Sequence, residues 1–137
     1  MINNRAKGPY HFDQYGTSVG GPIVRDKHFF FFNYDAQRNT VPNLVVLNLP
    51  ATTPTDPDTV AGIAKLRAKA NSYPRNQDQD VYLLKTDSSF SFGQLSFRYN
   101  RQEFTGRNFE NGGITNAEEH TGNSLVTTDT LTGSLIT

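Results

Sequence analysis

Apolar and polar positions alternate most clearly between Tyr15 and Arg38, where the pattern predicts two β-strands joined by a short turn. The first strand is rich in glycine, the turn covers residues 25–27, and the second strand opens with four consecutive phenylalanines, 29–32. Aromatic and β-branched runs bounded by turn residues are typical of strands. On even-numbered positions the second strand stays apolar along its length, whereas odd-numbered positions become polar after Phe31.

This distribution fits two kinds of protein. In a soluble β-sandwich the even-numbered face would pack on a second sheet. In an outer-membrane β-barrel the same face would contact lipid, and the other face would line a polar lumen. Four consecutive phenylalanines are costly to expose to water, so either arrangement has to cover this strand.

The same alternation returns in the second half of the chain. Residues 80–90 and 94–105 predict a second pair of strands, and the threonine-rich residues 123–136 predict a fifth strand. Charged residues that alternate with aromatic ones indicate a sheet with one apolar face and one wet face. We expect Lys85, Asp87 and Arg98 to form ion pairs across the strands, in a surface cluster that contributes little to stability.

The connections between the predicted strands alternate in length. Short turns at 25–27 and 91–93 contrast with long links at 39–79 and 106–122, as in outer-membrane barrels with short periplasmic turns and long external loops. Five prolines argue against a continuous strand or helix in the longer link: Pro42, Pro50, Pro54, Pro57 and Pro74.

A short helix is predicted within the longer link, from Thr59 to Ala70, because apolar residues recur there at near-helical spacing. Asp56 or Asp58 is expected to cap its start, and Asn71 to end it. The helix either packs on its own loop or forms part of an external gate for a ligand.

Together these patterns predict antiparallel strands at 13–24, 28–38, 80–90, 94–105 and 123–136, each paired with its neighbours in sequence. One set of residues is predicted to share the lipid-side face: Tyr15, Val19, Ile23, Phe30, Phe32, Tyr34, Tyr82, Leu84, Leu95, Phe97 and Tyr99. A second set is predicted to face the lumen: Lys85, Asp87, Arg98 and Asn100.

Composition and motifs point away from catalysis. The 13 basic and 13 acidic residues cancel, so no net charge favours nucleic acid, and cysteine is absent. No apolar run approaches the roughly 20 residues of a membrane-spanning helix. The histidines His11, His28 and His120 lack metal-ligand spacing, and no serine occupies a nucleophile elbow.

The glycines and aspartates also have structural explanations. The glycines Gly16, Gly20 and Gly21 do not form a phosphate loop, and close packing or a bend in the strand explains them better. Four aspartates are candidate calcium ligands, although their usual roles are solvation and helix capping: Asp56, Asp58, Asp78 and Asp80. We therefore expect no enzyme activity, no catalytic, cofactor-binding or metal residues and no cofactor, and the sequence leaves any ligand-binding residues unknown.

A family resemblance strengthens the membrane interpretation. Gln14-Tyr15-Gly16, then Gly20-Gly21-Pro22-Ile23, Asp26-Lys27 and Phe29-Phe30-Phe31, resemble in order and spacing a segment of TonB-dependent outer-membrane receptors of the Oar-like type. Residues 80–87 and 94–100 resemble the next hairpin of the same proteins.

The resemblance implies an all-β fold, a partial antiparallel up-and-down meander from a transmembrane barrel, with one short helix in a long loop. Residues 1–13 would be the lead-in between plug and barrel, and 14–137 a partial barrel. The start of the chain has no apolar signal-peptide core, so we expect a fragment of a longer protein.

The implied function is energy-coupled nutrient uptake across the bacterial outer membrane. The implied partners are the TonB complex, acting through a plug region missing here, outer-membrane lipid and an unidentified imported ligand, with no nucleic acid. The alternatives are a soluble β-sandwich that acts in binding or adhesion, and passive diffusion of the porin type.

Overall fold

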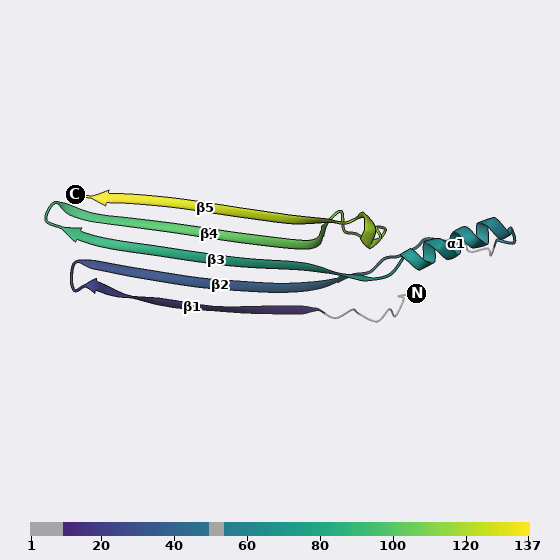
Figure 1. Cartoon of the computed structure of the whole chain (residues 1–137), viewed down its shortest axis with the longest axis horizontal. Coiled ribbons are helices and arrows are strands. Elements are labelled where there is room, and N and C mark those ends of the chain that lie inside the picture. Colours follow the sequence, from purple (N-terminus) through teal and green to yellow (C-terminus); the bar gives the residue numbers. More distant parts are fainter. Residues whose placement is uncertain (1–9, 50–53) are drawn as a thin grey trace. The chain divides into compact units, whose positions relative to one another are not determined.

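The computed structural model describes residues 10–49 and 54–137, which form one five-stranded antiparallel sheet, one α-helix and one short 3₁₀ helix. The strands are β1 (His11–Val24), β2 (His28–Asn43), β3 (Tyr73–Phe90), β4 (Gly93–Glu110) and β5 (Gly122–Ile136). They lie side by side in sequence order (Figure 1). The predicted all-β, up-and-down meander is therefore confirmed.

The strands are longer than predicted, which shortens the two long links to 44–72 and 111–121. The argument that proline excludes a strand is wrong at Pro42, in β2, and at Pro74, in β3. Both prolines lie within two residues of a strand end, where a missing backbone N–H disturbs the hydrogen-bond ladder little. β1 begins at His11, and residues 1–9 of the predicted lead-in lie outside the described residues.

Both predicted short turns are present. In the turn between β1 and β2, Asp26 has a positive φ of 62°, which aspartate tolerates better than most residues. The Lys27 backbone N–H donates to the Val24 carbonyl at 3.1 Å and closes this turn. The turn between β3 and β4 covers residues 91–92. Tight turns of this kind join each strand to its antiparallel neighbour.

The predicted helix is α1 (Pro57–Lys69), which begins two residues earlier than expected. Asp56 is the N-cap, and its carboxylate accepts a hydrogen bond from the Thr59 backbone N–H at 2.8 Å. Pro57 suits the first turn because its missing N–H would have no partner there. Beyond the end of the helix, the Asn71 amide donates to the Ala68 carbonyl at 2.8 Å, which agrees with its predicted role as a stop.

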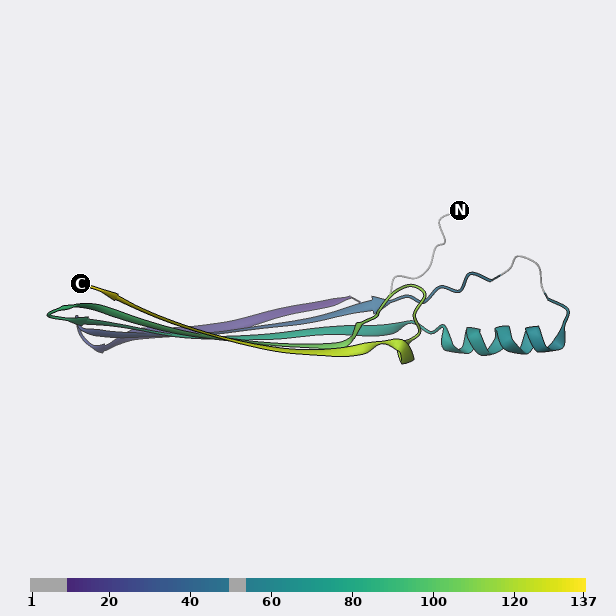
Figure 2. The ribbon, with the colours of Figure 1, turned by 90° about the horizontal axis from the view of Figure 1, so that it is seen from above.

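The chain divides into two compact units. The first, here called the strand body, comprises Phe12–Arg38, Asp78–Thr105 and Leu125–Thr137. The second, the loop unit, comprises Asn39–Gln77 and Gly106–Ser124 with the start of the chain through His11. The strand body is a single layer of strands (Figure 2). A β-sandwich needs a second sheet, and the described residues form only one.

Close contact between β1 and β2 explains two of the three glycines in β1. A Cβ atom added at Gly16 would lie 2.5 Å from the Tyr34 carbonyl oxygen, and one at Gly20 would lie 3.0 Å from the Phe30 carbonyl oxygen. A side chain at Gly21 would meet nothing within 4 Å. The close-packing explanation therefore holds for Gly16 and Gly20 but is wrong for Gly21.

Few side chains are buried in either unit. Ala36 is the buried apolar residue of the strand body, and Val45 and Tyr73 are buried in the loop unit. Many large apolar side chains of the strand body are instead exposed, for example Ile23 at 65% and Leu131 at 67%. A soluble sheet would cover such residues, so this pattern indicates that an apolar environment outside the chain covers them.

Candidate membrane-facing surface

One face of the strand body is defined by contacts between tyrosine rings and their neighbours. The rings of Tyr34 in β2 and Tyr82 in β3 lie 5.1 Å apart, centroid to centroid. The Arg38 guanidinium lies 5.7 Å from the centre of the Tyr15 ring, which places the β1 tyrosine on the same face. We call this surface the aromatic face.

Hydrogen bonds define the opposite face, here called the polar face. The Gln14 amide donates to the Asp35 carboxylate at 3.1 Å. The Lys85 ammonium lies 2.8 Å from Asp87, whose carboxylate also accepts a hydrogen bond from the Ser96 hydroxyl at 2.6 Å. Because successive side chains of a strand alternate between faces, these contacts fix the orientation of β1 to β4.

The predicted division of these residues between two faces is therefore confirmed by contacts and alternation. Tyr99, three positions from Ser96, joins the aromatic face, and its hydroxyl donates to Asp129 in β5 at 2.6 Å. The remaining residues predicted for this face follow by the same alternation: Val19, Ile23, Phe30, Phe32, Leu84, Leu95 and Phe97.

Four tyrosines form a row across neighbouring strands of the aromatic face, one in each of β1 to β4: Tyr15, Tyr34, Tyr82 and Tyr99. A tyrosine combines an apolar ring with a polar hydroxyl, so it suits the boundary between lipid and water. Girdles of aromatic residues mark such boundaries in outer-membrane barrels. We assign this row to one edge of the lipid-contacting band.

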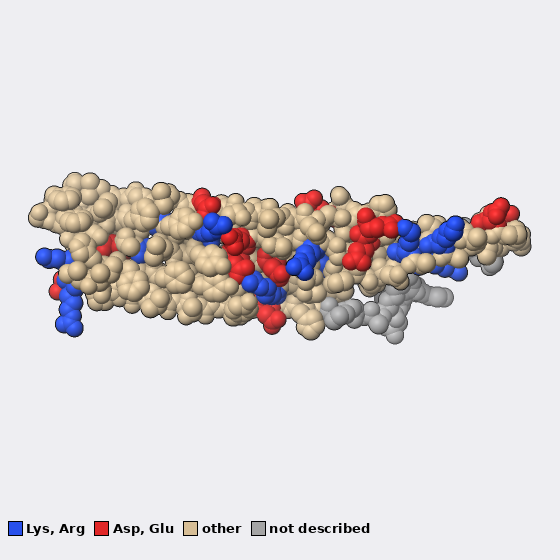
Figure 3. Space-filling model, in the orientation of Figure 1, with Lys and Arg blue, Asp and Glu red and all other residues tan. Residues whose placement is uncertain are grey.

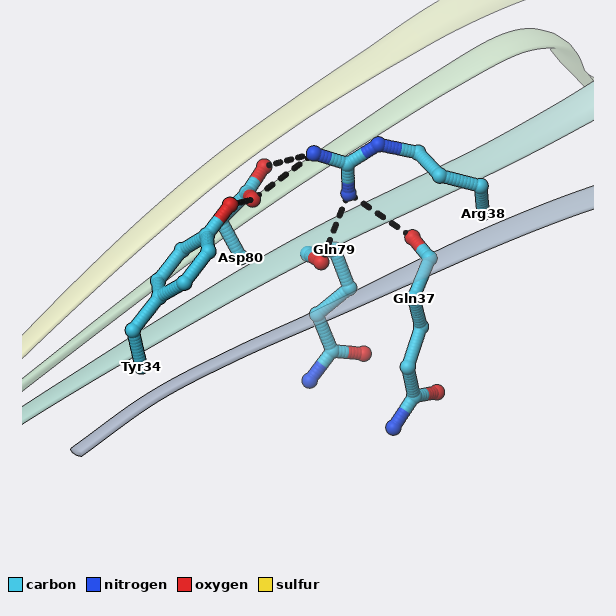
Figure 4. Close-up of polar contacts among 5 residues, drawn as sticks. All are labelled: Tyr34, Gln37, Arg38, Gln79 and Asp80. Carbon is cyan, nitrogen blue, oxygen red and sulfur yellow. Dashed lines mark hydrogen bonds and ion pairs between the residues drawn. The ribbon is translucent and has the colours of Figure 1, made fainter. Parts of the chain in front are cut away.

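Charged side chains begin at the row and continue away from the hairpin turns. The Arg38 guanidinium contacts both oxygens of Asp80, at 2.7 and 3.0 Å, and donates to the carbonyls of Gln37 and Gln79 at 2.9 Å (Figure 4). The Tyr34 hydroxyl donates to the same carboxylate at 2.6 Å. Both terminal nitrogens of the guanidinium and both carboxylate oxygens thus have hydrogen-bond partners in the chain, which lowers the cost of partial burial.

A second ion cluster lies at the same boundary on β4 and β5. The Arg101 guanidinium lies 2.7 Å from Glu103 and 3.8 Å from Asp129, the acceptor of the Tyr99 hydroxyl. Like the Arg38 pair, the cluster is only partly exposed, with about two fifths of each side chain of the Arg101–Glu103 pair open to solvent. The tyrosine row therefore coincides with the point at which the aromatic face becomes charged.

Between the tyrosine row and the hairpin turns, the aromatic face carries no Asp, Glu, Lys or Arg at any strand position. In the space-filling view, the end that carries the hairpin turns is largely uncharged apart from its tip, whereas cations and anions adjoin one another farther along the strands (Figure 3). In the same zone the polar face holds Lys85, Asp87 and Arg98. We therefore assign the uncharged face to contact with lipid.

Aromatic rings also mark the turn end of this uncharged band. The rings of Phe90 and Phe92 stack with centroids 5.1 Å apart, and His28 meets Phe90 edge to face at 5.6 Å. From Tyr82 to Phe90 a strand tilted by about 40° rises roughly 20 Å, close to the ~25 Å height of the apolar band in such barrels. Two aromatic groups thus bracket an uncharged span of membrane dimensions.

This boundary was not predicted from the sequence, although the sequence contains a signal for it. Arg38 and Asp80 have the same parity as Tyr34 and Tyr82, so alternation alone places them on the aromatic face. The expected ion pairing across strands on the polar face is wrong. Lys85 pairs with Asp87 within one strand, and Arg98 joins no ion pair among the described residues.

In the loop unit, the two long links contact each other. The Val46 N–H donates to the Ile114 carbonyl at 2.6 Å, and the Asn43 amide donates to the Gly113 carbonyl at 3.0 Å. The Lys69 ammonium lies 2.5 Å from Glu119, and it holds the pKa of that carboxyl below its usual value. The Lys69–Glu119 ion pair joins helix α1 to the link between β4 and β5. The role of the links as a gate for a ligand stays a prediction.

Four of the residues considered as metal ligands have other partners: Asp56, Asp80, His28 and His120. Asp56 caps the helix, and Asp80 binds Arg38. His28 packs on Phe90, and His120 lies 3.7 Å from Glu119. Within residues 10–49 and 54–137, no group of three His, Cys, Asp or Glu residues is arranged to hold a metal ion. Asp56 and Asp80 therefore act in capping and ion pairing.

Comparison with known proteins agrees with the membrane assignment. Residues 1–62 match a family model described as an outer membrane beta barrel domain. No curated protein and no solved structure matches the chain. No helix within the described parts of the chain is long and apolar enough to cross a membrane.

The meander, the lipid-contacting face and the family match together define the class: the chain is part of an outer-membrane β-barrel protein, located in the bacterial outer membrane. Outer-membrane barrels of this kind have at least eight strands. The five strands described here therefore supply one sector of a barrel wall.

Proposed function

We propose that this sector belongs to a TonB-dependent receptor of the Oar-like type, which imports a scarce nutrient across the outer membrane. One observation carries the proposal, namely the order and spacing of the motifs that resemble that family. Gly20-Gly21-Pro22-Ile23 closes β1, Asp26-Lys27 lies in the turn, and Phe29-Phe30-Phe31 opens β2. In such a receptor, residues 1–13 would lead from the plug into the barrel.

The alternation of connections also supports the proposal. The turns between β1 and β2 and between β3 and β4 are short, and an antiparallel meander places them at the end of the sheet opposite the long links. We assign the short turns to the periplasmic side and the links 44–72 and 111–121 to the outside. External links that contact each other suit a surface that meets a ligand before it enters the barrel.

Passive diffusion through an open porin is the competing function, because it uses the same wall but needs neither plug nor energy. The experiment is to purify the complete protein that contains this chain and to measure two properties. A TonB-dependent receptor is expected to bind the purified periplasmic domain of TonB and to show little conductance in a planar lipid bilayer. Stable open conductance without TonB binding would refute the proposal in favour of a porin.

A further inference from the structure

Arg98 differs from the two arginines of the tyrosine boundary. Arg38 and Arg101, on the aromatic face, each lie 2.7 Å from a carboxylate. On the polar face, Asp87 is occupied by Lys85 and by the Ser96 hydroxyl. Arg98 joins no ion pair within the part of the chain that the structure describes. Its charge is therefore available to a group from outside the chain.

The hollow that Arg98 lines supplies further hydrogen-bonding groups, and no acidic side chain lines it. Arg98 lines a shallow hollow of about 260 Å³ with Asn100 in the same strand and with Thr130 and Thr132 in β5. These residues offer one guanidinium, one amide and two hydroxyl groups, all of which can donate hydrogen bonds. They stand on two adjacent strands, so the backbone ladder fixes their spacing before any ligand arrives.

We propose that this hollow binds an oxyanion, namely a carboxylate or phosphate group of a small molecule that passes along the lumen. The proposal rests on the import function given above and names its substrate class as anionic. A guanidinium donates two parallel hydrogen bonds to such a group, and hydroxyl or amide neighbours complete its coordination. Cationic side chains on a pore wall select anions in the same way.

A solvated arginine is the simplest competing explanation, but the distribution of charge argues against it. Lys85 on the polar face, and both arginines of the tyrosine boundary, have anionic partners within 2.8 Å. The other residues that line the hollow with Arg98 are neutral, so no lining group pairs with its positive charge. Such a position attracts an anion and repels a cation, whereas a paired one does neither.

The test measures oxyanion binding by the full chain in detergent micelles. The NMR signal of the Arg98 side-chain N–H is followed while inorganic phosphate and, separately, acetate are added, so that the two oxyanions are distinguished. We expect saturable shifts with at least one of them. In Arg98→Gln the remaining backbone signals of Asn100 and Thr130 should respond at least about tenfold more weakly, because a charge-assisted hydrogen bond is lost.

Matched variants make the result decisive. Arg101→Gln removes a cation from the same strand on the opposite face, and it should leave binding unchanged. Arg98→Lys keeps the charge and should retain part of the affinity, which shows that loss in Arg98→Gln is not a folding defect. Equal, non-saturating shifts at all arginines, or unchanged binding in Arg98→Gln, would overturn the proposal. Neither result depends on TonB binding or conductance, so the two proposals fail separately.

Discussion

The lipid-facing assignment predicts that a charge on the aromatic face damages the barrel more than one on the polar face of the same strand. Phe32 and Phe31 provide the comparison, because they are adjacent in β2 and face opposite sides. The Phe32→Arg variant places a guanidinium against lipid. The Phe31→Arg variant places the same group towards the lumen, where water and polar groups can solvate it.

The expected cost follows from the position of Phe32 relative to the tyrosine boundary. Phe32 is two residues from Tyr34, which corresponds to roughly 5 Å along the barrel axis for a strand tilted by about 40°. An arginine costs about 2–4 kcal/mol at the bilayer midplane and about 0–1 kcal/mol near an interface. We therefore expect Phe32→Arg to cost about 2 kcal/mol, which lowers the ratio of folded to unfolded barrel roughly 30-fold.

The assay is a urea titration of the complete barrel in phospholipid vesicles, with the folded fraction read from the mobility shift of unheated samples on a denaturing gel. Phe31→Arg should cost clearly less than Phe32→Arg, and Asp35→Arg, also on the polar face, should behave like Phe31→Arg. If Phe31→Arg proves as damaging as Phe32→Arg, or more so, the assignment of the two faces is wrong.

Three further predictions concern packing, ion pairing and the loop helix. Gly16→Ala should destabilise the β1–β2 pair, because its Cβ would lie 2.5 Å from a carbonyl oxygen, whereas Gly21→Ala should have little effect. Hydrogen exchange of the β1 amides compares the two variants, and equal protection in both would contradict the packing argument. A double-mutant cycle on Arg38→Ala and Asp80→Ala should give a coupling energy of about 1 kcal/mol at most, since the pair is partly exposed, and zero coupling would show that the contact contributes nothing. Hydrogen bonds from Thr59 lower the pKa of the Asp56 carboxyl below its ordinary 3.8. The cap therefore stabilises the helix above pH 3.8, and this stabilisation is lost as the pH falls through the lower pKa of the folded state. The ¹³C shifts of the first helical turn should follow this loss, and Asp56→Ala should remove the pH dependence.

Much of the strand body could be predicted from sequence, because a period of two identifies both the strands and their faces. Phe30, Phe32 and Tyr34 have one parity, and the contacts of Tyr34 confirm the face that they share. The tight turn at 25–27 fixes the register of the first hairpin. This register determines which residues of β1 share a face with Phe30, Phe32 and Tyr34 of β2.

Strand ends were harder to predict, because they depend on contacts with other parts of the chain. Tyr73 is only 3% exposed, and its hydroxyl donates to the Asn116 carbonyl, so the start of β3 is held by a distant link. Arg75 is fixed in the same way, through the carbonyls of Asn108 and Phe109. These contacts cannot be predicted from the local strand propensity, and the nearby prolines argued against a strand.

The order of strands in the sheet has a consequence for folding kinetics. Every strand pairs with the next in sequence, so contact order is low and pairing can advance hairpin by hairpin. Closing the 44–72 connection costs about 2 kcal/mol more in chain entropy than closing a two-residue turn. The hairpins β1–β2 and β3–β4 should therefore form early, and the joining of β2 to β3 should set the rate at which this sector of the barrel assembles.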